Sequence, residues 1–223
     1  MNNKNPVYRI LSILVLILSS AVVSANTDPE PDVLMKTTTY NLIAAIKASN
    51  IKLTKDPEII HNLVLTHIAP RLDFIAAARW VLGKHWRDAD REQKIRFIKE
   101  FRKLLINFYS AALAEYAFNN DIDQNIMTFL PLREAHDGKD AIVYSIVSPP
   151  DSTKKVQVNY HMHNTSRGWK IYDVAVEGIS MITTYKSSFA PQLRNAGVEE
   201  LTNSLIERSA KLEAKKVNLS PSK

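Results

Sequence analysis

The sequence predicts an α+β fold, in which a helical layer packs on a curved, four-stranded antiparallel sheet. The first observation behind this prediction is that apolar residues recur at three- and four-residue spacing as far as residue 116. The second is a change of that period from 3.6 to 2 after residue 121, and the third is a return to helical spacing after residue 180. Helices, then consecutive strands, then helices are the element order of an α+β protein.

Four helices are expected in the first half of the chain, over residues 33–49, 57–69, 74–86 and 90–116. Asp56, Asp73 and Asp90 each stand directly before one of them, where a side-chain oxygen can cap the free backbone N–H groups. Pro57 suits a first helical position, and Gln93 completes a capping box with Asp90.

The second half of the chain alternates apolar and polar residues, which is typical of half-buried strands. Strands are expected over residues 126–132, 141–148, 155–164 and 169–177. Short connections, such as the turns at Asp137-Gly138 and Arg167-Gly168, imply an antiparallel meander. Two closing helices are expected around residues 180–193 and 198–215.

The first 25 residues are predicted to be a signal peptide. Lys4 and Arg9 precede the apolar run ILSILVLILSSAVV, and Val23-Ser24-Ala25 supplies the small residues that a signal peptidase reads. The run has 14 residues, whereas a membrane span needs about 20. We therefore expect cleavage after Ala25 and export of the rest of the chain, with an uncleaved N-terminal anchor as the alternative.

Residues 26–223 are predicted to form a single domain. Its parts are expected to be a mainly helical region over 32–120, the sheet over 121–178 and the C-terminal helices over 179–215.

Composition excludes several classes of function. The chain has no Cys, so disulfides, thiol nucleophiles and cysteine-ligated metals are ruled out. It has five Gly and no dinucleotide, P-loop or nucleophile-elbow motif. The formal charge is +6, and removing the two bases of the leader leaves +4. Export argues against nucleic acid as a partner. The bases of the long helix are expected on a solvated face, with docking at anionic head groups or an acidic partner as alternatives.

Two groups of polar residues are candidate chemical sites. His161 and His163 share a strand face and could chelate a metal, but no third ligand is apparent, so a polar strand edge is expected. Asp173 and Glu177 could serve acid–base chemistry, but no second catalytic group stands at a defined spacing. No catalytic residue and no metal ligand are therefore predicted.

Two blocks of sequence resemble the MlaC family of periplasmic phospholipid-binding proteins, also called toluene-tolerance auxiliary proteins. The first block comprises Leu72-Asp73-Phe74, residues 81–86 (VLGKHW), Phe97, residues 101–105 (FRKLL) and Tyr109. The second comprises residues 168–174 (GWKIYDV), residues 176–182 (VEGISMI) and Tyr185. The likeness extends from about residue 32 to residue 212, with Leu72 standing where many relatives have Phe.

The resemblance implies a helical part joined to a sheet related to the NTF2-like cone, enclosing an apolar cavity. It also implies a carrier, expected to be a monomer, that shuttles glycerophospholipids between the two membranes and maintains outer-membrane lipid asymmetry. Its implied partners are an inner-membrane ABC transporter complex with an MCE-domain subunit and an outer-membrane lipoprotein–porin complex. Neither catalysis nor a cofactor is implied, since the phospholipid is cargo. The alternatives are an NTF2-like small-molecule enzyme and a periplasmic protein-binding adaptor.

The lipid is expected to lie between the facing helices and one side of the sheet, and alternation along the strands selects the residues on that side. Tyr172, Val174 and Val176 are expected to share one face of the fourth strand. The expected lipid-binding residues are Phe74, Ile75, Val81, Leu82, Leu105, Phe108 and Tyr109 of the helices, and Tyr144, Val158, Tyr160, Met162, Tyr172, Val174, Val176 and Ile179 of the sheet side.

Overall fold

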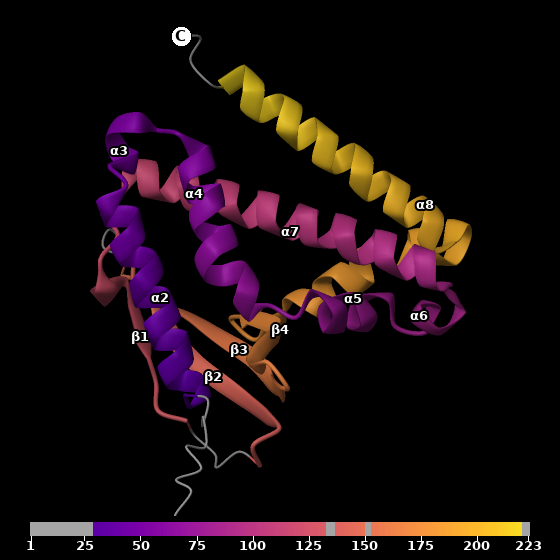
Figure 1. The fold of residues 1–223 in the computed structure, drawn as a ribbon, viewed down its shortest axis with the longest axis horizontal. Helices are drawn as coiled ribbons and strands as arrows, with labels where there is room; N and C mark the ends of the chain where they lie inside the picture. Colours follow the sequence, from indigo (N-terminus) through magenta and orange to yellow (C-terminus); the bar gives the residue numbers. More distant parts are fainter. Residues whose placement is uncertain (1–28, 133–136, 150–152, 220–223) are drawn as a thin grey trace, which may run out of the picture.

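The structure, a computed structural model, describes residues 29–132, 137–149 and 153–219, with the side chains described up to residue 211 (Figure 1). Its α-helices are α2 (Pro31–Ala48), α3 (Ile51–Thr54), α4 (Pro57–Leu63), α5 (Phe74–Leu82), α6 (His85–Asp88), α7 (Arg91–Asn119) and α8 (Met181–Leu219). Shorter turns are η1 (Val64–Ile68), η2 (Ala69–Arg71) and η3 (Gln124–Ile126). The strands are β1 (Met127–Phe129), β2 (Asp140–Val147), β3 (Val156–Thr165), β4 (Gly168–Val176) and β5 (Ile179–Ser180). The predicted signal peptide lies outside the described residues.

Helix starts lie where capping residues predict them. An Asp90 carboxylate oxygen accepts a hydrogen bond from the backbone N–H of Gln93 at 2.8 Å. The Gln93 side chain accepts one from the backbone N–H of Asp90 at 3.1 Å, so the capping box of α7 is confirmed. Asp73 caps α5 in the predicted manner, accepting from the backbone N–H groups of Ile75 and Ala76.

Two of the predicted helices are interrupted. The one expected over 57–69 leaves α-helical geometry at Val64 and continues as the π-helix η1 and the 3-10 turn η2. The one expected over 74–86 divides at Gly83, whose φ of +56° is disfavoured for other residues. A Cβ atom at Gly83 would lie 3.2 Å from Cε of Lys186, a flexible side chain that can shift, so the positive φ is the reason for glycine here.

The sheet is antiparallel, as predicted, but it has five strands and not four. Its order is β1-β2-β3-β4-β5, so each strand pairs with its neighbour in sequence. The additional strand β5 pairs with the end of β4, with Ile179 opposite Val176. Glu177 and Gly178 between them have φ values of 50° and 79°, which is the backbone of a tight two-residue hairpin turn. Residues 179–180 are therefore a short strand, where the sequence predicts the beginning of a helix.

Helix α8 consists of two helical segments that meet at Gly197, whose φ of 76° and ψ of −173° are not helical. This confirms the two closing helices predicted from the sequence. The second segment begins beside α7, where Arg96 of α7 forms an ion pair with Glu199, and then diverges from α7 (Figure 1).

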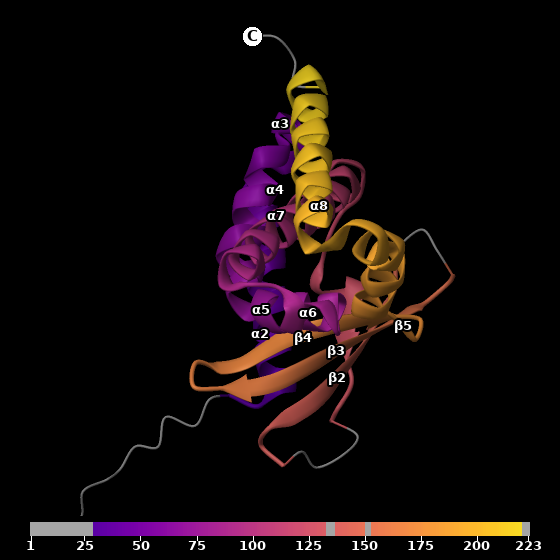
Figure 2. The ribbon, with the colours of Figure 1, turned by 90° about the vertical axis from the view of Figure 1, so that its right-hand side faces the viewer.

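The two sides of the sheet have different surroundings. Figure 2 shows α5, α6, α7 and α8 on one side of the strands. Ala141 and Val143 of β2 and Met162 of β3 form a buried cluster with Leu34 and Met35 of α2. We call the side that carries these three strand residues the helix-facing side. Because side chains alternate along a strand, their direct neighbours project from the opposite side.

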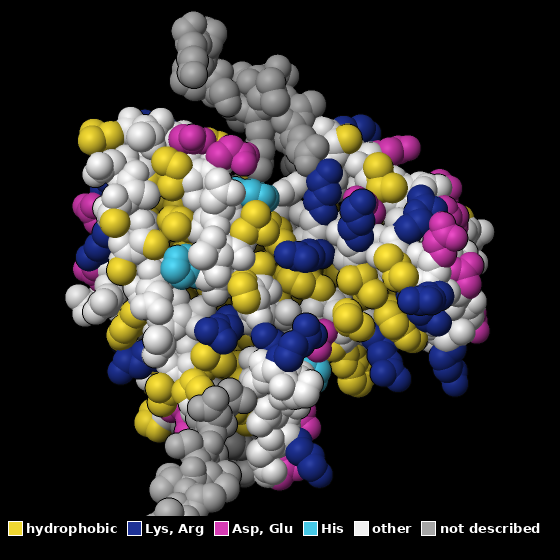
Figure 3. All heavy atoms as spheres, in the orientation of Figure 1, with side chains coloured by type: hydrophobic (Ala, Val, Ile, Leu, Met, Phe, Trp, Pro, Cys, Tyr) yellow, Lys and Arg dark blue, Asp and Glu magenta, His cyan; other side chains and the backbone are white. Residues whose placement is uncertain are grey.

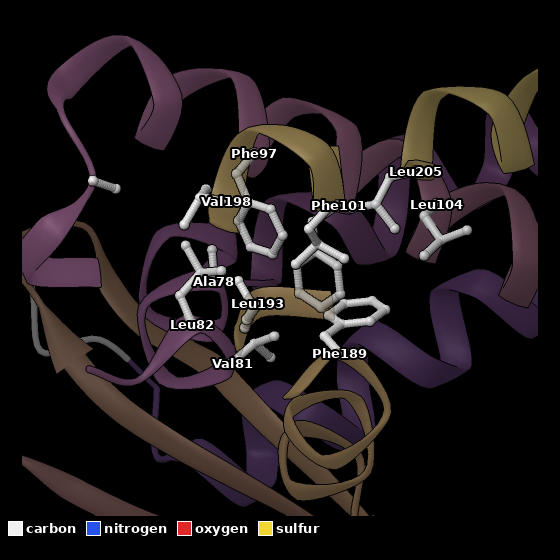
Figure 4. Close-up of a cluster of buried hydrophobic side chains, with 12 residues drawn as sticks. Ala78, Val81, Leu82, Phe97, Phe101, Leu104, Phe189, Leu193, Val198 and Leu205 are labelled. Carbon is white, nitrogen blue, oxygen red and sulfur yellow. The ribbon is translucent and has the colours of Figure 1, made fainter. Parts of the chain in front are cut away.

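Helix α7 links two of the three buried clusters. Its first half joins α5 and α8 in the cluster drawn in Figure 4, which contains Phe97, Phe101, Val81, Leu193 and Leu205. Its second half packs with α2, α3 and α4 in a second cluster. The third cluster lies between α2 and the sheet. Among the described residues, no helix has both the length and the apolar content that crossing a membrane requires.

Candidate functional site

The residues predicted to bind lipid fall into four environments. Val81, Leu82 and Met162 are at most 1% exposed and pack within the buried clusters. Val158, Tyr160, Val174, Leu105 and Phe74 are partly buried. The exposed members are Ile75, Phe108, Tyr109, Val176 and Ile179. Tyr144 and Tyr172 project from the side of the sheet opposite the helices.

Three partly buried residues line up across the helix-facing side of the sheet. Tyr160 of β3 stands opposite Val174 of β4, and Val158 stands opposite Val176. The Tyr160 ring lies 6.3 Å from that of Phe129, and its hydroxyl lies 3.7 Å from the sulfur of Met127. Burial raises the pKa of Tyr160, so this side chain is a neutral, largely apolar surface.

Phe129 and Met127 of β1 belong to this surface although they are not among the predicted residues. They lie opposite Ser145 and Val147, on the side of β2 that faces the helices. The sequence signal for them is the two-residue spacing within the first predicted strand, which places both on one face.

Tyr144 and Tyr172 lie on the other side of the sheet. Tyr144 stands between Val143 and Ser145, which are both fully buried on the helix-facing side. Tyr172 is the extra residue of a β-bulge, since His161 pairs with Asp173 and the next residue, Met162, pairs with Ile171. The expected shared face of Tyr172 with Val174 and Val176 is therefore wrong, and the Tyr172 ring lies 5.3 Å from that of His163.

The exposed apolar residues include two pairs that we together call the apolar rim: Phe108 and Tyr109 of α7, and Val176 and Ile179 of the β4–β5 hairpin. Their exposed fractions are 52%, 40%, 36% and 66%, in that order. The Tyr109 hydroxyl lies 3.6 Å from the sulfur of Met181, two residues after Ile179, so helix and hairpin approach each other here. The Phe108 ring meets the Tyr109 ring edge-on at 5.2 Å.

The apolar rim is anchored in the packed core through Tyr185. Tyr109 and Tyr185 share a side-chain hydrogen bond, and burial raises the pKa of both phenols, so both stay neutral at ordinary pH. The Tyr185 ring in turn contacts Phe101 at 5.3 Å and Phe189 at 5.6 Å. Met181 and Tyr185 are absent from the predicted lipid-binding set, although both lie in the second block of the family resemblance.

The remaining predicted residues lie where α5 approaches α7. The guanidinium of Arg102 stacks 5.3 Å above the ring of Phe74, and the next residue, Ile75, is 55% exposed. Leu105 packs at the edge of the cluster that contains Phe101.

The protein family of this chain follows from a comparison of its sequence with family models. The model of the family described as MlaC protein matches residues 36–207, which is most of the chain. The chain belongs to the MlaC family.

Two characterised proteins are similar to this MlaC-family chain along most of their length. The "Intermembrane phospholipid transport system binding protein MlaC" of Haemophilus influenzae is 23% identical over 206 residues, covering 89% of this chain and 92% of that protein. The "Toluene tolerance protein ttg2D" of Pseudomonas putida is 29% identical over 186 residues, covering 83% and 82%.

A solved structure resembles this MlaC-family chain in both fold and sequence. It is the phospholipid-binding protein from Ralstonia solanacearum in complex with a phospholipid, with a TM-score of 0.70 and 30% sequence identity. The match covers 82% of this chain and 98% of that one.

Two open depressions in the described part of this MlaC-family chain lie away from the predicted lipid-binding residues. They have volumes of about 370 and 380 Å³ and adjoin each other near the end of α7. Their lining includes Lys47, Lys52, Leu53, Asn120 and Asp121. None of their lining residues is a predicted lipid-binding residue.

The carboxylates considered for acid–base chemistry have structural hydrogen bonds in this MlaC-family fold. One oxygen of Asp173 accepts from the Ser180 hydroxyl at 2.6 Å, and the other accepts from the backbone N–H of Ile182 at 3.1 Å. Asp173 thus holds the first turn of α8 against the sheet. Glu177 accepts a hydrogen bond from the backbone N–H of Gln157 across the strand end.

The two strand histidines also have local partners. Nε2 of His163 lies 2.9 Å from a carboxylate oxygen of Asp73, the residue that caps α5. The His161 ring lies 6.2 Å from that of Tyr172. Within the described ranges, no three His, Asp or Glu side chains are grouped closely enough to hold a metal ion.

Proposed function

We propose that this protein binds a phospholipid and carries it between the membranes of the cell envelope. The main support for the proposal is an apolar stripe on α7. Side chains of α8 bury one end of this stripe and leave the other end exposed. Phe101 is 1% exposed beneath Tyr185 and Phe189 of α8, with ring contacts at 5.3 and 6.2 Å. Phe108, two helical turns further along the same stripe, is 52% exposed. A bound acyl chain would supply the cover that the protein does not.

The acyl chains are placed between α7 and the helix-facing side of the sheet, entering at the apolar rim. Val158, Tyr160 and Val174 lie on that side of the sheet and are partly exposed. We propose that this space is the apolar cavity of an NTF2-like cone and that it opens as the lipid enters. Val81, Leu82 and Met162 would then support its walls from within the packed core.

The energetics of burial suit a carrier. Each CH₂ group moved from water to an apolar site contributes about 0.8 kcal/mol, so two acyl chains contribute on the order of 20 kcal/mol. A bilayer offers nearly the same gain. The protein therefore needs only to match the bilayer and to cover the lipid in transit, which an apolar surface without catalytic groups does.

The names of the relatives support the wider role. The Ralstonia protein is described with a bound phospholipid, and the Haemophilus protein is named for an intermembrane phospholipid transport system. We extend this to a monomeric periplasmic carrier, exported by residues 1–25, that maintains outer-membrane lipid asymmetry. It would exchange lipid with an inner-membrane ABC transporter complex containing an MCE-domain subunit and with an outer-membrane lipoprotein–porin complex. It would need neither catalysis nor a cofactor.

Phospholipid transfer between donor and acceptor vesicles tests the proposal. The protein is expected to accelerate transfer in proportion to its concentration. Phe108→Asp places a carboxylate where an acyl chain must pass and is expected to abolish most of that acceleration, because burying an unpaired charge is costly. Leu53→Asp is the matched control, since Leu53 is 85% exposed on α3 away from the rim. No acceleration by the unaltered protein would contradict the proposal.

A further inference from the structure

The segment from residue 74 to residue 103 carries most of the excess positive charge of the chain. It contains nine Lys and Arg and four Asp and Glu, a net charge of +5 out of +6 for the whole sequence. It forms α5, α6 and the first half of α7, which pack together around the first buried cluster. The charge is therefore concentrated on one part of the surface and not spread evenly.

Large apolar side chains are exposed among these bases. Trp80 is 58% exposed, and Ile75 and Ile95 are each 55% exposed. These three side chains point away from the core, because Val81 and Phe97 on the same two helices are fully buried. A Trp and two Ile facing solvent on neighbouring helices are unusual for a surface that stays in water.

Exposed bases lie near these residues in the chain. Arg79 belongs to α5 with Ile75 and Trp80, Lys84 stands directly before α6, and Lys99 follows Ile95 by one turn on α7. The Arg102 guanidinium stacks 5.3 Å above the Phe74 ring, which joins the outward side of α7 to the start of α5. We call the six residues Ile75, Arg79, Trp80, Lys84, Ile95 and Lys99 the basic–apolar patch.

Figure 3 shows Lys and Arg side chains beside hydrophobic ones over α6 and the adjoining part of α7. The acidic residues of the segment do not cancel this charge. Asp90 is engaged in capping α7, where it accepts a hydrogen bond from the Gln93 N–H. Asp88 and Glu92 are exposed, Glu100 is partly buried, and five net positive charges remain with these acids counted.

We propose that the basic–apolar patch docks on the surface of an anionic phospholipid bilayer. Trp80, Ile75 and Ile95 would enter the boundary between head groups and acyl chains, where Trp is favoured by its amphipathic ring. Arg79, Lys84 and Lys99 would contact the lipid phosphates, each attracted by the negative surface potential. An acidic protein would pair with the same bases, but exposed Trp and Ile interleaved with them match a lipid surface better. No patch residue belongs to the apolar rim, but Ile75 is also a predicted lipid-binding residue, so docking is tested at Trp80 and the bases.

Vesicle sedimentation tests the docking surface. The full protein is mixed with vesicles of phosphatidylcholine alone and with vesicles that contain 30% phosphatidylglycerol. We expect binding to the anionic vesicles only. Arg79→Gln/Lys99→Gln removes one base from each helix and should weaken that binding about 25-fold, at about fivefold for each base lost. Lys55→Gln/Lys155→Gln removes two exposed bases elsewhere and should change it less than twofold.

Trp80→Ser tests the apolar contribution, with Leu53→Ser at another exposed apolar position as its control. The Trp80 variant should bind anionic vesicles several-fold more weakly, and the Leu53 variant should bind like the unaltered protein. Equal binding to neutral and anionic vesicles, no binding to either, or equal loss in patch and control variants would overturn the proposal. Mass spectrometry of the same preparations reports lipid loading separately. Protein that is loaded but does not dock would overturn docking and leave the carrier function standing.

Discussion

Two phenylalanines of α7 separate the structural role of this helix from its proposed functional role. Phe101 and Phe108 are seven residues apart and occupy the same apolar stripe, yet their exposed fractions are 1% and 52%. Phe101 stacks 5.5 Å from Phe97 and meets two rings of α8, whereas Phe108 contacts Tyr109 at the rim. The stripe thus belongs to the core at one end, and at the other end it is the surface that we propose the lipid covers.

Alanine substitution is expected to separate the two roles. On lipid-free protein, Phe101→Ala should lower the free energy of unfolding by about 3–5 kcal/mol, because it leaves a cavity in a packed cluster. Phe108→Ala should lower it by less than about 1 kcal/mol, as at a surface position. The Phe108 variant should nevertheless purify with less phospholipid. Urea unfolding and the ratio of lipid to protein measure both effects, and equal destabilisation by the two substitutions would count against the assignment.

The sequence predicts the apolar stripe on α7, but it does not predict which residues of the stripe are buried. Helical spacing alone places Phe101 and Phe108 on one face. The rings that bury Phe101 come from Tyr185 and Phe189, more than eighty residues later, so burial depends on tertiary packing. The bulge at Tyr172 is missed for a similar reason, because one extra residue reverses the alternation without any signal in the residue types.

Among the elements, those with strong local signals are predicted and those set by neighbours are not. Asp73 and Asp90 cap the helices that they were predicted to begin, because capping depends only on residues two or three positions along. Strand β5 is two residues long and is defined by pairing with β4, which no local period reveals. The division at Gly83 rests on the positive φ of that glycine, which helical spacing does not reveal.

The junction within α8 depends on one glycine. At Gly197, φ is 76° and ψ is −173°, a region that residues with a Cβ atom rarely enter, while a Cβ atom would meet nothing within 4 Å. Gly197→Ala is therefore expected to destabilise the protein by about 1–3 kcal/mol through backbone strain alone. Asn195→Ala, at an exposed helical position nearby, should change stability by less than about 0.5 kcal/mol. Thermal unfolding compares the two, and an unchanged midpoint for Gly197→Ala would show that the junction carries no such strain.

For the whole molecule, the candidate site exists only because the topology assembles it. The apolar rim takes two residues from α7 and two from the β4–β5 hairpin, about seventy residues later, and the start of α8 closes the contact between them. Composition and period predict the α+β class but cannot bring these segments together. The family resemblance could, because both of its sequence blocks lie in the segments that meet at the rim.

The most direct test of the account is native mass spectrometry of the full protein, purified without detergent, with identification of any bound lipid. We expect a mass increase that matches a phospholipid and that disappears when the protein is denatured. The Phe108→Asp variant should show less of this adduct, and Leu53→Asp should retain it. Protein that is consistently free of lipid, and that takes up none from phospholipid vesicles, would contradict the proposal that this protein binds a phospholipid.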